Sequence, residues 1–82
     1  MREAVHAGAA LAVGLRLTDL NVQDVWGRYV ALGGRHTRYE LACYICGDGD
    51  WDPGEHDIAA RAINEFTSER GMDHPVSYSE EL

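Results

Sequence analysis

Apolar residues recur at helical spacing in three stretches of the chain, and the first is LNVQDVWGRYVALGG at residues 20–34. Its apolar positions follow the i, i+3, i+4, i+7, i+8 spacing that places side chains on one face of a helix. These positions are Val22, Val25, Trp26, Tyr29 and Val30. The pattern predicts a helix over residues 22–32 with this face buried in a core.

Polar residues and glycines support the limits of this helix. Asn21 precedes the apolar pattern and is a favourable N-cap. The two glycines at positions 33 and 34 suit the left-handed conformation of a helix end. Asp24 and Arg28 lie four residues apart in acid-first order, which predicts an ion pair on the flank of the helix.

The second stretch, HTRYELACYICG, combines a strong start signal with an apolar body. Thr37 and Glu40 have the spacing of a capping box, in which each side chain bonds the backbone N–H of the other residue. Almost every residue from Leu41 onward is apolar, and a helix without a polar face is usually buried. We therefore expect a short helix over residues 38–46 in the centre of the fold.

The third stretch, DPGEHDIAARAINEFTSERG, has the clearest boundaries. Asp52 is a good N-cap, proline is favoured at the first helical position, and Glu55 completes a capping box. One helical face is apolar throughout, at Ile58, Ala59, Ala62, Ile63 and Phe66. Gly71 suits the end, with Met72 expected to pack back on the last turn. The pattern predicts a helix over residues 53–70.

The outer parts of the chain lack this regularity. Residues 1–17 are rich in alanine and glycine, and they suit either a helix or a tail. Residues 73–82 contain a proline and no helical period, so we expect an extended or flexible tail. Residues 18–72 form the predicted domain, a compact all-α bundle of three helices, with a fourth if the N-terminal segment orders.

The amino-acid composition gives the chain a large net negative charge. The 82 residues include 14 acidic side chains and seven basic ones, and the formal charge is −7. A field of this sign repels phosphate backbones and anionic membrane surfaces, so we expect neither nucleic acid nor membrane as a general partner. No apolar run approaches the ~18 residues that cross a bilayer, and no targeting signal is evident, which favours a cytoplasmic protein.

The stretch CYICGDGDWDPGEHD at residues 43–57 gathers cysteines, acids and a histidine, which are ligand types for metals. An EF-hand loop that starts at Asp48 would need glycine where Pro53 stands and glutamate where Ala59 stands. Zinc would need two ligands beside the cysteines, which lie in the apolar helix. We interpret the stretch as the end of one helix and the start of the next, with Trp51 packed between them. The two cysteines are then expected to be buried in the core as small apolar side chains, and no metal or cofactor is expected.

Two other functions stay open as alternatives, a small zinc or calcium module and a DNA-binding regulator. The helices joined by GGRHT have the outline of a helix-turn-helix, and Arg28, Arg35 and Arg38 could form a basic patch. The apolar body of the following helix offers few side chains to read base edges. His56 and Asp57 point apart on a helix, and no nucleophile has matched partners, so we do not expect an enzyme.

Two motifs carry a resemblance to a group of known proteins. WGRYVALGG at residues 26–34 and HDIAARAINE at residues 56–65 are the motifs. They resemble the W-x-R-Y-x-A-L-G-G and H-D-x-x-A-x-A-x-N-E patterns of short actinobacterial all-helical proteins of unassigned function. The resemblance covers residues 18–78 and implies a helical fold without implying a chemistry.

The expected function is that of a small acidic regulator or adaptor that binds another protein, or a second copy of itself, without catalysis. Its aromatic side chains exceed what so small a core needs to bury, and aromatic residues with arginine dominate protein contact sites. The predicted contact residues are Trp26, Arg28, Tyr29 and Arg35.

Overall fold

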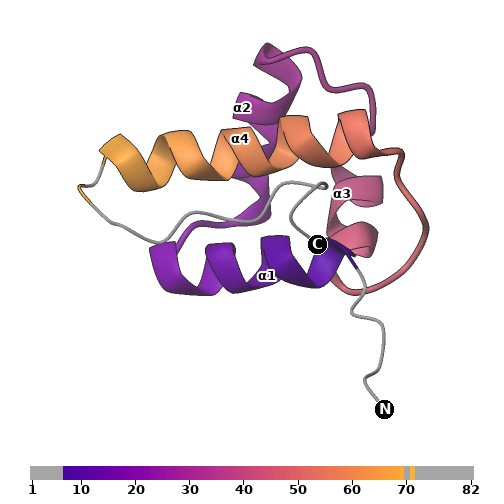
Figure 1. Ribbon diagram of the computed structural model, residues 1–82, viewed down its shortest axis with the longest axis horizontal. Coiled ribbons are helices and arrows are strands. Elements are labelled where there is room, and N and C mark those ends of the chain that lie inside the picture. Colours follow the sequence, from indigo (N-terminus) through magenta and orange to yellow (C-terminus); the bar gives the residue numbers. More distant parts are fainter. Residues whose placement is uncertain (1–6, 70, 72–82) are drawn as a thin grey trace.

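The computed structural model of the chain describes residues 7–69 and 71, and within these residues the fold consists of four helices without a strand (Figure 1). The helices are α1 (Ala7–Thr18), α2 (Val22–Ala31), α3 (Arg38–Ile45) and α4 (Pro53–Glu69). The all-α prediction is confirmed for this part of the chain, and the N-terminal segment contributes α1. The predicted tail at residues 73–82 lies outside the described residues.

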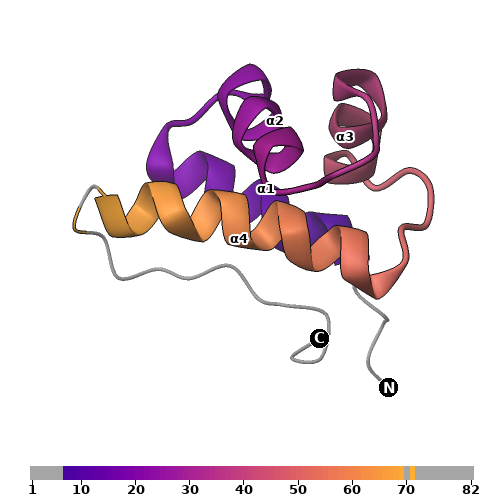
Figure 2. The same ribbon diagram turned by 90° about the horizontal axis from the view of Figure 1, so that it is seen from above.

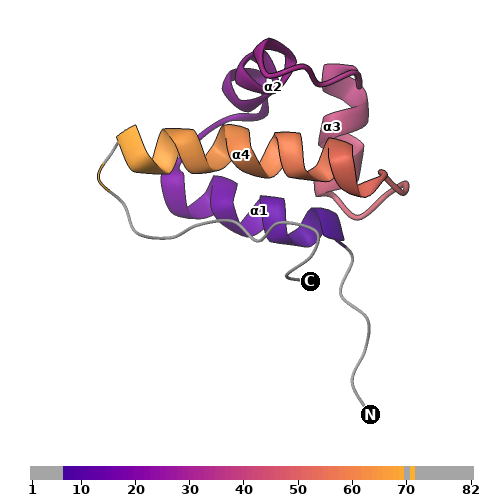
Figure 3. The same cartoon turned by 45° about the horizontal axis from the view of Figure 1, so that its top comes forward.

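The helices form two layers. α1 and α4 lie side by side and run in the same direction (Figure 1). α2 and α3 pack against this pair from one side, where α2 contacts α4 and α3 contacts α1 (Figure 2, Figure 3). The α2–α3 connection and the α3–α4 loop therefore meet near the start of α4. None of the described helices is both long enough and apolar enough to cross a membrane.

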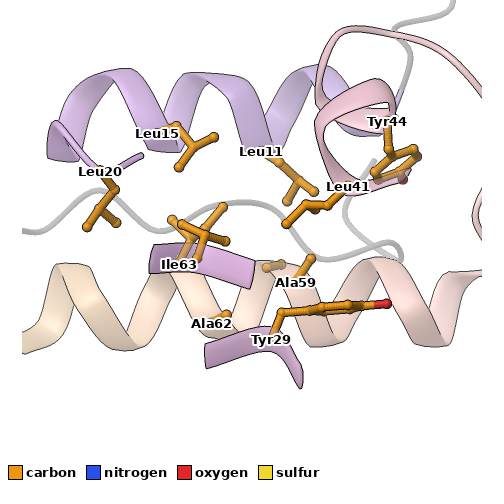
Figure 4. Close-up of a cluster of buried hydrophobic side chains, with 11 residues drawn as sticks. Leu11, Leu15, Leu20, Tyr29, Leu41, Tyr44, Ala59, Ala62 and Ile63 are labelled. Atoms are coloured by element: carbon orange, nitrogen blue, oxygen red, sulfur yellow. The ribbon is translucent and has the colours of Figure 1, made fainter. Parts of the chain in front are cut away.

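The core lies between these layers (Figure 4). Every helix and the α1–α2 turn contribute to it, through Leu11, Leu15, Leu20, Val25, Tyr29, Leu41, Tyr44, Ala59, Ala60, Ala62 and Ile63. The three alanines of α4 are small, which lets its neighbours approach the α4 backbone closely. Burial of a leucine or isoleucine side chain stabilises the fold by about 1.5–3 kcal/mol, so packing outweighs local helix propensity.

Packing explains why α1 forms despite two glycines. Leu11 and Leu15 lie at i, i+4 and both enter the core, while Gly8 and Gly14 are buried. Each glycine disfavours the helix by about 1 kcal/mol, which is less than one buried leucine contributes. The helix ends at Asp19, whose φ of 54° is left-handed, and the next amide donates to the Leu15 carbonyl at 3.3 Å. This is the helix ending that usually carries glycine.

The predicted starts and caps of α2 and α3 are confirmed. The side chain of Asn21 accepts a hydrogen bond from the Asp24 amide at 2.9 Å. Both bonds of the capping box between Thr37 and Glu40 are present. These caps satisfy backbone N–H groups that the first turn of a helix leaves without an internal partner.

The predicted ends of α2 and α3 are confirmed to within one residue, because the helices end at Ala31 and Ile45 and not at residues 32 and 46. The expected glycines with positive φ follow both helices, 104° at Gly33 and 100° at Gly47. α4 runs over Pro53–Glu69, and Gly71 beyond it has a φ of 71°. The predicted contact of Met72 lies outside the described residues.

α3 is not buried on all sides, contrary to the prediction. Leu41 and Tyr44 turn into the core, whereas Tyr39 is 77% exposed. Cys43 is half-buried and Cys46 is exposed, so the prediction that both cysteines are buried in the core is wrong. The reason is that α3 packs on the bundle with one face, and its other face is apolar although it meets solvent.

Candidate functional site

Trp51, in the loop between α3 and α4, stacks on side chains from other segments. Its ring lies nearly parallel to Tyr44, with centroids 4.4 Å apart at 1°, and to His36, 4.0 Å apart at 11°. Tyr29 adds a contact at 5.5 Å and 29°. The prediction that Trp51 packs between the helices on either side of it is confirmed for α3, through Tyr44, and its other stacking partners come from α2 and the α2–α3 connection. Since aromatic pairs contribute about 0.5–1.5 kcal/mol each beyond burial, the stack fixes the loop against α3.

The buried hydroxyl of Tyr29 joins α2, the α2–α3 connection and α4. It donates a hydrogen bond to Oε1 of Glu55 at 2.5 Å. It also accepts from the backbone amides of Arg35 at 3.0 Å and His36 at 2.8 Å. The Arg35 amide reaches the same Glu55 oxygen at 3.0 Å. The predicted capping box of α4 is therefore wrong at Glu55, because its carboxylate binds these donors instead of the amide of Asp52.

His36 is fixed from several directions although its side chain remains partly exposed. Its amide donates to Tyr29, and its carbonyl accepts from the indole N–H of Trp26 at 3.0 Å. Its ring stacks on Trp51, and Nδ1 lies 3.5 Å from Oε1 of Glu40. Its side chain is 28% exposed, so one part of this ordered ring faces solvent.

The contact between Tyr29 and Glu55 changes the pKa of both groups. Burial, and then the hydrogen bond to the Glu55 carboxylate, raise the pKa of Tyr29 to about 12. Burial alone would raise the pKa of Glu55, but the hydrogen bonds from Tyr29 and the Arg35 amide outweigh it and leave that pKa below its usual value. The pair therefore stays in its phenol–carboxylate form around neutral pH.

Stability should fall as the pH rises from about 10 to about 12, the range between the ordinary pKa of tyrosine and the raised pKa of Tyr29. In this range the unfolded chain releases the phenol proton while the folded chain retains it. Linkage predicts a loss of roughly 2–3 kcal/mol at the upper end. Urea unfolding at a series of pH values measures it. Burial also raises the pKa of Tyr44, and a hydrogen bond with the Cys43 thiol raises that of Tyr39. Tyr29→Phe should therefore retain only the smaller dependence that these two groups contribute. An unchanged dependence in Tyr29→Phe would contradict the assignment.

A pocket of about 260 Å³ opens beside the aromatic stack. Its lining residues are His36, Tyr39, Glu40, Cys43, Asp48, Gly49, Asp50 and Trp51, and we call it the α3 pocket. Two aromatic side chains and a thiol give it an apolar wall, and three carboxylates from α3 and the loop surround that wall. A hydrogen bond with the thiol of Cys43 is the main cause that raises the pKa of Tyr39, so its hydroxyl is neutral at physiological pH.

Arg28 finds its partners on α4, and the predicted ion pair with Asp24 is wrong. Its guanidinium lies 3.1 Å from Oε1 of Glu65 and 2.9 Å from Oε2 of Glu69. It also lies over the ring of Phe66, 4.2 Å from the centroid. One ring and two carboxylates thus hold this guanidinium between the two helices.

The fold brings Trp26, Tyr29 and Arg35 close together, but the four predicted contact residues do not form one exposed surface. Tyr29 is fully buried, so it cannot touch a partner unless the core opens. Trp26 is half-buried, and its indole N–H donates to the His36 carbonyl. The guanidinium of Arg28 is bound by carboxylates of α4. Arg35 is exposed. Val30, which was predicted on the buried face of α2, is 42% exposed.

The exposed apolar face of α3 is a feature that was not predicted from the sequence. Tyr39, Cys43 and Cys46 lie at i, i+4 and i+7, the spacing of a single helical face. The signal was present in the sequence, but Leu41 and Tyr44 form a second apolar face on the same helix. Spacing alone does not say which of two apolar faces meets the core.

The ligand types in the acidic loop do not converge. Within residues 7–69 and 71, no group of three or more His, Cys, Asp or Glu side chains is gathered to hold a metal ion. His56 lies in the core, 1% exposed, with Nδ1 2.7 Å from the hydroxyl of Tyr44. Asp48 and Asp50 are exposed to solvent.

The arginines predicted as a DNA-binding patch do not act together. Arg28 is neutralised by the carboxylates of α4, while Arg35 and Arg38 are exposed. The exposed face of the would-be recognition helix carries Tyr39 beside the carboxylates of the α3 pocket. Carboxylates at that position repel a phosphate backbone.

Comparison of the chain with family models, with curated proteins and with solved structures gives no match.

Proposed function

We propose that this protein is a non-enzymatic adaptor that binds another protein through the α3 pocket and the ring of Tyr39. The observation that carries the proposal is the 77% exposure of Tyr39 at the mouth of that pocket. Exposing a large aromatic ring gives up the stabilisation that burial would provide, and aromatic residues are enriched at the centres of protein contacts.

The segments that form the wall of the pocket are already fixed in place, and this supports the same function. The stack of Trp51 on His36 and Tyr44 holds the loop, and the Tyr29 hydroxyl holds the α2–α3 connection. A partner that binds a wall already fixed in this way loses little conformational freedom, so more of the contact energy appears as affinity.

Site-specific photo-crosslinking tests the proposal. A p-benzoylphenylalanine at position 39 should form a covalent adduct with a partner in cells that express the protein. The same group at position 30, where Val30 is also exposed but does not line the pocket, is the control and should form no such adduct. Excess wild-type protein should compete for the adduct, and the Tyr39→Ala variant should not.

Two results would contradict the proposal. One is an equal yield of the same adduct from both positions, which would indicate contact without a preferred face. The other is competition by Tyr39→Ala as effective as that by the wild type, because the exposed ring would then contribute nothing to binding.

A further inference from the structure

We infer that the α3 pocket receives an arginine side chain from a basic segment of the partner protein. This inference rests on the proposed function and names the chemistry that the pocket selects. Three features of the molecule support it, namely the charge of the pocket, a guanidinium site elsewhere in the same molecule and the net charge of the chain.

The charge of the pocket is complementary to a cation. Glu40, Asp48 and Asp50 contribute three carboxylates, and within the described part of the lining His36 alone is able to carry a positive charge. The pKa of Glu40 is lowered, chiefly by the hydrogen bond from the Thr37 amide, so this carboxylate is charged at neutral pH. A carboxylate can accept several hydrogen bonds, and the cap leaves Glu40 with capacity for another donor.

The protein already binds one guanidinium with the same set of groups. Arg28 lies over the ring of Phe66 and contacts the carboxylates of Glu65 and Glu69. The α3 pocket offers a corresponding set, in which the exposed ring of Tyr39 stands beside three carboxylates. Among the described residues that line the pocket, none is an arginine.

Arginine fits this set better than lysine does. A guanidinium is planar, stacks on aromatic faces and can bond a carboxylate with two parallel N–H groups. An ammonium is a compact and strongly hydrated charge, which gains less from an aromatic wall. The pocket volume of about 260 Å³ is small compared with sites for whole drug-sized ligands, and it suits the end of one long side chain.

The net charge of the chain favours a different protein over a second copy. Each copy carries a formal charge of −7, so two copies repel each other as they approach. A basic segment is instead attracted by the same field, and its association is faster at low ionic strength.

Peptide binding tests the inference. The probe is a fluorescein-labelled, acetylated and amidated Gly-Arg-Gly-Arg-Gly peptide, and the matched control replaces each arginine by citrulline, which has nearly the same shape without the charge. Fluorescence anisotropy should show that the arginine peptide binds about tenfold more tightly than the citrulline peptide. A lysine peptide should have an intermediate affinity, because it keeps the charge and loses the planar group.

Matched protein variants separate the pocket from the general negative field. Asp48→Asn with Asp50→Asn should weaken arginine-peptide binding about fivefold. Asp19→Asn with Asp24→Asn removes the same charge elsewhere and should weaken binding less than about twofold. Asparagine tolerates the left-handed φ of Asp19, and thermal unfolding monitored by circular dichroism verifies that both variants fold.

Three outcomes would overturn the inference. The first is equal affinity for the arginine and citrulline peptides, and the second is equal weakening by both double variants. The third is self-association that the pocket variants abolish, because the arginine would then come from a second copy. If position 39 still crosslinks a partner while the peptides bind alike, only the arginine inference fails and the proposed function stands.

Discussion

Tyr29→Phe is expected to lower the free energy of unfolding by roughly 2–4 kcal/mol, although the ring keeps its size. The hydroxyl donates to a carboxylate and accepts from two backbone amides, at Glu55, Arg35 and His36. Bonds to charged groups contribute more than neutral ones, and groups left without a partner lose further energy. The Arg35 amide keeps its bond to Glu55, so the His36 amide loses the most. Urea unfolding at neutral pH measures the change.

Tyr39→Phe is the matched control for this substitution. It removes the same atom from an exposed residue, so stability should change by less than about 0.5 kcal/mol. A loss in Tyr29→Phe no larger than in the control would show that the buried hydroxyl does not hold α2, the connection and α4 together.

Gly34→Ala is expected to destabilise the protein by about 1–3 kcal/mol. A methyl group at this position would overlap three ring atoms of Tyr29, and the hydrogen bonds of that ring prevent it from moving aside. The Gly34 amide also donates to the Tyr29 carbonyl at 2.9 Å, which fixes the backbone over the ring. The melting temperature should fall by several degrees, since ~1 kcal/mol corresponds to about 4–8 °C in a domain of this size.

Gly27→Ala is a control with the opposite expected sign. Gly27 lies within α2, and an added methyl group meets no atom within 4 Å. Alanine in an exposed helix interior should stabilise the protein by about 0.5–1 kcal/mol. If both substitutions stabilised the protein to the same degree, close packing of Gly34 on the Tyr29 ring would be ruled out.

The local features of the fold could be predicted from the sequence. The cap at Asn21 and the capping box of Thr37 and Glu40 depend on residues within one helical turn. The helix ends at Gly33 and Gly47 depend on the backbone freedom of a single residue. Each of these features depends only on residues that are a few positions apart in the sequence, so it can be predicted without the tertiary structure.

Side-chain partners far apart in the chain could not be predicted in this way. Arg28 had an acidic residue one turn away, but it binds carboxylates 37 and 41 residues later. Glu55 was expected to cap its own helix, but a buried hydroxyl 26 residues earlier holds it. In both cases a partly buried partner offers a stronger bond than an exposed local one, and sequence spacing does not reveal that partner.

The candidate site was missed for a related reason. A helix that is apolar on two faces can bury either one, and the positions of α1 and α2 decide that Leu41 points inward and Tyr39 outward. Asp48 and Asp50 lie in the stretch that the sequence marks as the boundary between two helices. Their place beside Tyr39 depends on how Trp51 stacks on α3, which is a tertiary contact.

The stack also links stability to binding. Tyr29 holds the amide of His36, and the ring of His36 stacks on Trp51 at the wall of the pocket. A variant that weakens the Tyr29 contact should therefore loosen the pocket wall before the whole fold opens. We expect Tyr29→Phe to bind the arginine peptide more weakly than the wild type does, even under conditions where it remains folded.

Chemical-shift mapping of the ¹⁵N-labelled protein, titrated with the Gly-Arg-Gly-Arg-Gly peptide, locates the binding surface most directly. The largest changes should fall on the backbone amides of residues 36–51 and on the indole N–H of Trp51. The exposed side of α4 around Arg61 should change little. Changes spread evenly over the molecule, or largest on α4, would contradict a binding site at the α3 pocket.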